Sequence, residues 1–345
     1  MGLQSMLQLQ SFGLPANRWF RRADVVHYHI VHDGFFSLSA LPLLSRLKPS
    51  VWTWHDLWPM TGHCIQPMEC ERWRTGCGEC PDLARPLAMK VDKTRQAFGL
   101  KRRIVRNSPI DVVVASQWML NMARESPIAA GTRLHHVPFG VDLKRFAPRD
   151  GTTARDSFGI LPDRVVVAVR GFLSPYKGIR EFASALELIK TPLCVLSMND
   201  EGGFDRLIGR HQIIALDWTY DEDIIIDAYS AADFFVMPST AEAFGLMAIV
   251  AMACGKPIVA FEGTALPEVT FAPEVGIAVP MRDIGSLANA VQHLVDDVGD
   301  RLRRGRRARE IAEKHYSSDL YAGRLATLYR SVAAGRVERA DDRPL

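Results

Sequence analysis

Short runs of Val, Ile and other apolar residues recur along the chain. In these runs apolar and polar residues do not alternate, and this feature constrains the fold more than any other. These runs are DVVHYHIV from Asp24, SVWTWHD from Ser50, DVVVAS from Asp111, RVVVAVRGF from Arg164, LCVLSMN from Leu193, QIIALDW from Gln212, DFFVMPS from Asp233 and KPIVAF from Lys256. Strands of this kind are buried on both faces, which is typical of parallel sheets covered by helices. Helical patterns lie between them, for example GIREFASALELI from Gly178. The sequence therefore predicts an α/β fold with doubly wound sheets.

A break in this pattern predicts two domains. Between His135 and Asp163 the chain is rich in Pro, Gly and charged residues, and a fresh series of strands and helices follows. A length of 345 residues also favours about two domains. We expect an N-terminal domain over residues 1–147, a C-terminal domain over 148–315, and a final helix over 316–335 that crosses back to the N-terminal domain.

Composition excludes several classes of protein. The net charge is only +3, and 48% of the residues are hydrophobic, which is ordinary for a globular protein and gives no basic stripe for nucleic acid. No window approaches the 18 apolar residues of a transmembrane helix, and the start has no secretory-signal pattern. We expect a cytoplasmic protein. The arginines of RLRRGRRARE, from Arg301, form either a solvated helix face or a peripheral contact with the inner membrane face.

Several ordered motifs resemble one family of enzymes. The run PSTAEAFGLMAIVAMACGKPIVAFEGTALPEV from Pro238, YKG from Tyr176, and HVPFGVDLKRFAP from His136 resemble the retaining nucleotide-sugar glycosyltransferases with the GT-B fold, family 4 or group 1. The first half, with ADVVHYHIVHDGFF and WTWHDLWPMTGHC, is similar to a bacterial subgroup that builds surface polysaccharides, including exopolysaccharide and lipopolysaccharide. The resemblance covers roughly residues 23–329.

The resemblance implies a fold and a reaction. Two Rossmann-like domains would face a cleft, and a hexose would move from a nucleoside diphosphate to a saccharide or lipid-linked acceptor with retention and without a catalytic metal. The donor would bind to the C-terminal domain and the acceptor to the N-terminal domain. Family members have further elements before the DVVH strand, so the N-terminal domain looks shortened at its start.

The donor site is expected around YKG and EAFG. A leaving diphosphate needs cations and aimed N–H groups, which Lys177 and the start of a helix near Gly245 would supply. By resemblance, Glu242 holds hydroxyls of the donor sugar. Alternatively, Lys177 is a solvated loop lysine and Glu242 an exposed acid at a helix N-terminus. The expected donor-binding residues are Gly171, Lys177, Gly178, Glu242, Phe244, Gly245 and Leu246.

A second set of candidate catalytic residues lies in the N-terminal domain. His55 and Asp56 end a strand, where α/β folds bind ligands. By resemblance, His55 faces the donor sugar, and together with Asp56 and Glu242 it forms the catalytic set. A structural, hydrogen-bonded histidine is the alternative. His27, His29 and His32 are expected to be structural, with His29 or His32 also able to line the acceptor side.

Four of the six cysteines form a cluster of their own. Cys64, Cys70, Cys77 and Cys80 lie close together, and the last two form a Cys-x-x-Cys. In a cytoplasmic protein this spacing favours a structural zinc site. Reduced thiols in a packed loop and disulfides are the alternatives. Cys194 and Cys254, in apolar surroundings, are expected to be core residues.

One position departs from the family pattern. The family carries a second acid eight residues after the first, which accepts hydrogen bonds from the donor ribose, and here that position is Val250. A valine cannot accept them, so donor binding would be weakened, or the ribose held otherwise. The alternative function is therefore a non-catalytic relative that binds a sugar or a partner enzyme.

Overall fold

The chain forms two compact units. The computed structural model describes residue 6 and residues 8–32 and 34–335. Within these residues, unit 1 runs to Pro138 and resumes at Ala322, and unit 2 is Phe139–Tyr321. The division falls before the boundary expected near Pro148, because the segment in between is bonded to unit 2. The Val141 amide donates to Tyr316 O at 2.8 Å, and Arg309 donates to the carbonyls of Leu143 and Phe146.

Unit 1 contains a four-stranded sheet. Its order follows the sequence, β1-β2-β3-β4, and every pair is parallel. The strands are β1 (Val26–His29), β2 (Ser50–Thr53), β3 (Ile110–Val114) and β4 (Arg133–His136). β2 and β3 are buried at every position, as the continuous apolar runs predict, whereas β4 is half exposed. The carboxyl ends of β1 and β2 therefore lie next to each other at one edge of the sheet.

Unit 2 contains a six-stranded parallel sheet. Its strands are β5 (Val166–Arg170), β6 (Cys194–Met198), β7 (Gln212–Leu216), β8 (Phe234–Met237), β9 (Ile258–Phe261) and β10 (Ile277–Val279). The order is β10-β9-β8-β5-β6-β7, so the winding reverses between β5 and β8. Such a reversal opens a crevice outside the carboxyl ends of the two strands, where doubly wound folds bind ligands.

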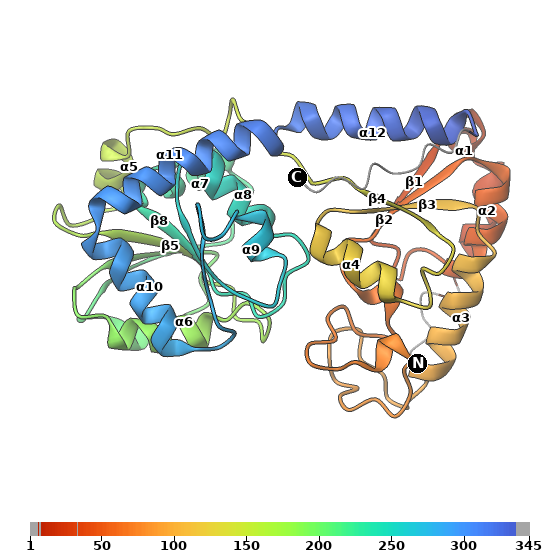
Figure 1. The fold of residues 1–345 in the computed structure, drawn as a ribbon, viewed down its shortest axis with the longest axis horizontal. Helices are drawn as coiled ribbons and strands as arrows, with labels where there is room; N and C mark the ends of the chain where they lie inside the picture. Colours follow the sequence, from red (N-terminus) through yellow and green to blue (C-terminus); the bar gives the residue numbers. More distant parts are fainter. Residues whose placement is uncertain (1–5, 7, 33, 336–345) are drawn as a thin grey trace. The chain divides into compact units, whose positions relative to one another are not determined.

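Helices surround both sheets (Figure 1). In unit 1 they are α1 (Arg18–Arg22), α2 (Leu41–Leu47), α3 (Thr94–Arg106) and α4 (Gln117–Glu125). In unit 2 they are α5 (Thr152–Ser157), α6 (Ile179–Leu188), α7 (Glu222–Ala231), α8 (Leu246–Ala253), α9 (Leu266–Val269), α10 (Ile284–Asp296) and α11 (Val298–His315). The last helix, α12 (Ser318–Ala333), begins in unit 2 and ends in unit 1. Within the described residues, none of these helices is both long and apolar enough to cross a membrane.

Alternate residues of the central strands of unit 2 face opposite layers of helices. Val167 and Val169 of β5 share one core with residues of α6 and α10, which pack on the same face. On β8, Phe235 contacts the ring of Tyr229 from α7. Burial on both faces is the reason that these strands are apolar throughout.

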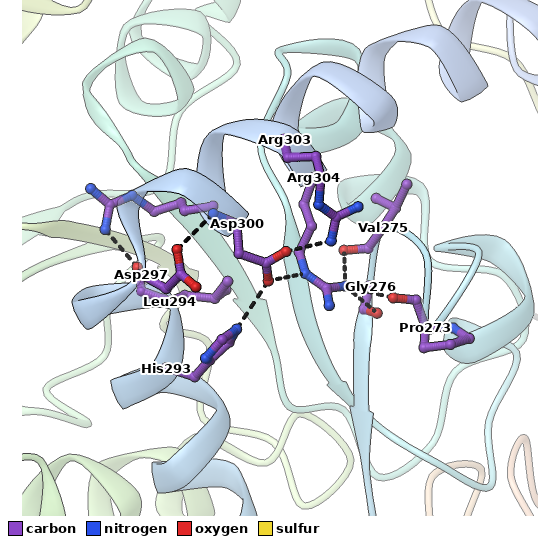
Figure 2. A network of polar contacts seen from close by, with 10 residues as sticks. Pro273, Val275, Gly276, His293, Leu294, Asp297, Asp300, Arg303 and Arg304 are labelled. Carbon is purple, nitrogen blue, oxygen red and sulfur yellow. Dashed lines mark hydrogen bonds and ion pairs between the residues drawn. The ribbon is translucent and has the colours of Figure 1, made fainter.

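An ion-pair network holds α11 against α10 and the loop before β10 (Figure 2). Asp300 accepts from Arg304 Nε at 2.6 Å and from Arg303, and its Oδ2 lies 2.9 Å from His293 Nε2. Burial alone would raise the pKa of Asp300, but the bonds from Arg304, His293 and Arg303 outweigh it and lower that pKa. Arg304 also donates to Pro273 O at 2.6 Å. Arginines of α11 are thus bound to carboxylates of the protein.

Candidate functional site

The switch point of unit 2 contains a small polar cavity. It has a volume of about 140 Å³ and is lined by residues from the carboxyl ends of β5 and β8, the loops that follow them, and the first turn of α8. Its polar side chains are Arg170, Lys177, Ser239 and Glu242. The cavity therefore lies where the sheet order predicts a ligand site.

An ion pair between two predicted residues lies in this cavity. Lys177 Nζ is 2.9 Å from Glu242 Oε2, and the two side chains are 27% and 17% exposed. The Thr240 amide donates to Tyr176 O at 2.9 Å and so joins the two loops that carry them. Neither side chain is the fully solvated loop residue that the alternative interpretation required. The carboxylate of Glu242 keeps further acceptor positions for a ligand.

Two glycines let the backbone approach the cavity. Gly178 has a φ of 63°, and a Cβ there would lie 1.7 Å from Pro238 O in the loop after β8. Gly245 has a φ of 97° and caps the N-terminus of α8. Both left-handed conformations are ones that a side chain disfavours. The third predicted glycine, Gly171, directly follows β5, and its amide donates to Met198 O at 2.8 Å.

The first turn of α8 lies against this cavity. Leu246 and Met247 of the first turn line it, and the preceding Phe244 is buried against Phe139 and Tyr316. A helix N-terminus carries partial positive charge that favours anions. Val250, one turn further along α8, is 7% exposed and does not line the cavity.

Arg170 also lies in this site, although it was not among the residues predicted from the sequence. It is the last residue of β5, its guanidinium lies 5.8 Å from the ring centre of Trp218, and it lines the cavity beside Lys177. Its position at the end of an apolar run was a usable signal, because the carboxyl end of a strand is where α/β folds bind ligands.

The carboxyl ends of β1 and β2 in unit 1 bring histidines together. His29 Nδ1 lies 2.9 Å from His55 Nε2, so one ring donates to the other. His27 lies 2.6 Å from Tyr329 Oη and 2.7 Å from Thr53 Oγ1 through its two ring nitrogens. The contact with Tyr329 of α12 joins residues that are 302 positions apart, and no local sequence pattern could have indicated it.

These histidines are held in the neutral form. Burial, together with the charge that His29 and His55 would carry, lowers the pKa of His27 to about 3. Burial and the neighbouring His29 lower the pKa of His55 to about 4. Near neutral pH each ring is therefore both a hydrogen-bond donor and an acceptor. His55 lies at the strand end predicted for it, with His29 as a direct partner.

Asp56 is held beside the histidines by two contacts. Its Oδ2 lies 3.1 Å from His32 Nε2, and its Oδ1 accepts from the Trp58 amide at 2.8 Å. Behind Trp58 lies Lys101, a buried lysine that donates to Trp58 O at 2.6 Å and contacts its ring. Burial lowers the pKa of Lys101 to about 7. This support fixes the turn that carries His55 and Asp56.

The four clustered cysteines line one small cavity in unit 1, together with His63. All four are free, Cys77 Sγ accepts from the Gly62 amide at 3.2 Å, and Cys80 Sγ lies 3.4 Å from His63 Nε2. Among the described residues, however, no three His, Cys, Asp or Glu side chains are arranged to hold a metal ion. The zinc site expected of Cys64, Cys70, Cys77 and Cys80 stays a prediction, with reduced thiols in a packed loop as its alternative.

If the four cysteines hold zinc, elemental analysis of the purified protein should find close to one equivalent, and its chelation should destabilise unit 1 selectively. Reduced thiols would instead let a thiol reagent titrate these four half-buried cysteines in the native protein and leave the buried Cys194 and Cys254 for the denatured one. Metal-free protein with four titratable thiols and unchanged melting would contradict the zinc site.

Comparisons with known proteins match the part of the chain that contains this cavity. Residues 163–297, which include the cavity, match the family model described as "Glycosyl transferases group 1". D-inositol 3-phosphate glycosyltransferase 2 of Catenulispora acidiphila is 31% identical over 233 residues. That match covers 59% of this chain and 55% of the relative, so the chain spans about half the length of that relative.

Solved structures resemble the chain over most of its length. Sucrose-phosphate synthase from Thermosynechococcus elongatus has a TM-score of 0.68 at 22% identity and covers 92% of this chain and 76% of its own. The Anabaena protein HepE in complex with UDP-glucose has a TM-score of 0.66 at 18% identity, covering 89% and 79% respectively. The two parallel sheets and this likeness confirm the α/β GT-B fold that the sequence predicted.

Proposed function

We propose, on the premise of the group 1 glycosyltransferase match in unit 2, that the chain transfers a sugar from a nucleoside diphosphate to an acceptor hydroxyl with retention. The observation that carries this proposal is the cavity at the β5–β8 switch point. It combines Arg170 and Lys177 with the N-terminus of α8 and the carboxylate of Glu242. Cations suit a diphosphate, and a carboxylate suits sugar hydroxyls.

Arg170, Lys177 and α8 would bind the diphosphate. As the bond between the sugar C1 and the phosphate oxygen breaks, negative charge grows on the leaving group, and fixed positive charge stabilises it. Two side-chain cations and a helix N-terminus can supply that charge, and we therefore propose a transferase that needs no catalytic metal. Gly171 and Gly178 would let the backbone approach the phosphates, while Phe244 and Gly245 would position the first turn of α8.

Glu242 would hold the donor sugar. Its ion pair with Lys177 fixes one carboxylate oxygen, and the remaining acceptor positions can take sugar hydroxyls. The acceptor oxygen would attack C1 on the face that the diphosphate leaves. Its proton would pass to a phosphate oxygen of the donor, so that the products are the glycoside and the protonated nucleoside diphosphate.

Unit 1 would bind the acceptor and contribute His55 and Asp56. Neutral His55, held by His29, can donate to or accept from a hydroxyl without carrying charge. The acceptor class that we propose is a saccharide or a lipid-linked saccharide, in surface polysaccharide synthesis in the cytoplasm, with a peripheral contact to the inner membrane face. The name of the curated relative offers a phosphorylated polyol as the competing acceptor.

The first test is hydrolysis of a panel of nucleotide sugars, since transferases leak donor to water. We expect measurable release of one nucleoside diphosphate. We expect Lys177→Ala to weaken binding of that diphosphate by about 1.5–3 kcal/mol, the value of a hydrogen bond to a charged group. Calorimetric titration measures the affinity.

Lys190→Ala is the matched control, because Lys190 is an exposed lysine of the same unit outside the cavity. An unchanged affinity of Lys177→Ala for the nucleoside diphosphate would show that the diphosphate does not bind in this cavity. Diphosphate binding without hydrolysis or transfer of any donor would favour the non-catalytic alternative.

A further inference from the structure

Unit 1 contains a second, larger hollow that the proposed reaction does not use. It has a volume of about 1440 Å³ and lies where α3 ends and β3 and β4 begin. His29 and His55 lie at the opposite, carboxyl edge of the same sheet. The hollow is therefore separate from the site that we propose for the acceptor.

The charged side chains in the described lining of this hollow are all arginines. Five of them contribute, Arg46 from α2, Arg102, Arg103 and Arg106 from α3, and Arg133 from β4. The described residues that line it include no Asp or Glu. Such a surface concentrates positive potential, because among the described residues only Arg133 of these five is paired with a carboxylate.

Most of these arginines have no anionic partner within the part of the chain that the structure describes. Arg133 is paired with Asp111, and the one acceptor given for Arg46 among these residues is Pro42 O of its own helix, at 3.2 Å. In the described part of the chain, the guanidinium groups of Arg102, Arg103 and Arg106 have neither an ion pair nor a hydrogen-bond acceptor. On α11, by contrast, Arg303 and Arg304 are both bound to Asp300 (Figure 2).

Helix stability does not account for the whole arrangement. Cations in the last turn of α3 offset the negative end of its dipole, which explains Arg103 and Arg106. The dipole of α3 does not explain the presence of Arg46, which lines the same hollow from another helix. It also does not explain why α3 contains no acid in TRQAFGLKRRIVR, where a Glu could pair with these arginines along one face.

We propose that this hollow binds a ligand with two or more phosphate groups. Guanidinium groups bind phosphate through paired N–H donors, and several spread over a wide hollow suit several phosphates better than one. The phosphates can belong to a soluble polyphosphorylated molecule or to a cluster of anionic lipid headgroups. Both sources share the same chemistry, and the binding experiment separates them.

The experiment measures binding of two probes in a Lys177→Ala background, so that the proposed donor site does not contribute. One probe is inorganic tripolyphosphate, measured by calorimetry, and the other is phosphatidylglycerol vesicles against phosphatidylcholine vesicles, measured by sedimentation. Replacing Arg102, Arg103 and Arg106 together by Ala is expected to weaken binding at least about tenfold. Replacing the same three by Lys should retain most of the binding of a vesicle surface and less of tripolyphosphate.

The matched control removes three positive charges elsewhere, by changing Lys144, Arg306 and Lys314 to Ala. These are exposed residues of unit 2 that lie outside the hollow. Binding that falls in the arginine variant and not in this control supports the proposal, and the responding probe identifies the source. Binding of neither probe, or an equal loss in both triple variants, would overturn it. Circular dichroism of each variant shows that the fold is intact.

Discussion

Unit 1 is expected to lose about 3–5 kcal/mol of its free energy of unfolding as the pH falls from 6.5 to about 4. The cause is a set of half-buried histidines. Burial lowers the pKa of His27 to about 3, and burial also lowers the pKa of His55 and of His136 to about 4. If the full pKa shifts were converted into free energy of unfolding, the loss would be larger. Solvent reaches part of each ring, however, and screens the effect.

The direction of this change in stability follows from which state, folded or unfolded, binds more protons. Below pH 6.5 the unfolded chain protonates these histidines, whereas the folded unit keeps them neutral until the pH approaches their lowered pKa values. The unfolded state therefore gains protons that the folded state cannot take, and stability falls with pH across this window. The loss is complete only below the folded pKa values.

Urea unfolding followed by tryptophan fluorescence measures this effect in unit 1. Of the seven tryptophans only Trp218 lies outside unit 1, so a Trp218→Phe background isolates the signal. His136→Gln should flatten the pH dependence, because it removes one of the three rings. His293→Gln, in unit 2, is the control and should leave it unchanged. If the stability of unit 1 stays constant between pH 6.5 and about 4, the histidines are not held neutral in the folded unit.

The second large effect is expected from Val250→Glu. The side chain is 7% exposed in α8 and does not line the donor cavity. A glutamate there would bury a carboxylate with no partner, and we expect unit 2 to lose roughly 3–5 kcal/mol, as when one partner of a buried ion pair is removed. Thermal unfolding at neutral pH measures the loss.

Val250→Gln separates charge from size, since it adds the same volume without a carboxylate, and it should be clearly more stable than the glutamate variant. Binding of nucleoside diphosphate should not improve in either. A glutamate variant that is as stable as the parent and binds the diphosphate about tenfold more tightly would show that position 250 faces the ribose, as in the family pattern.

The sequence predicted the strands that are buried on both faces. β2, β3, β5, β6, β8 and β9 follow continuous apolar runs because helices cover both sides of these strands. β4 had no such signal, since its sequence RLHH is polar and half exposed at the edge of the sheet. The reversal of strand order at β5 and β8 was likewise invisible, because it depends on which distant strands pair.

The candidate donor site was predictable for a simpler reason. Lys177, Gly178 and Glu242 lie in the loops that follow β5 and β8, and parallel strands bring their carboxyl ends to one edge of the sheet. What the sequence could not indicate were contacts made across long separations. The pairing of His27 with Tyr329 and the gathering of arginines from α2, α3 and β4 in one hollow both depend on the folded topology.

The discontinuous make-up of unit 1 has a consequence for synthesis on the ribosome. Unit 2 is one unbroken stretch that ends at Tyr321, whereas unit 1 combines early residues with residues from Ala322 onward. The early part emerges first, but the hydroxyl that binds His27 belongs to Tyr329, which is made after the whole of unit 2. The nascent chain therefore holds the β1–β4 segment without helix α12 until unit 2 and Tyr329 have been made, so the middle of the chain can complete its fold before unit 1 does.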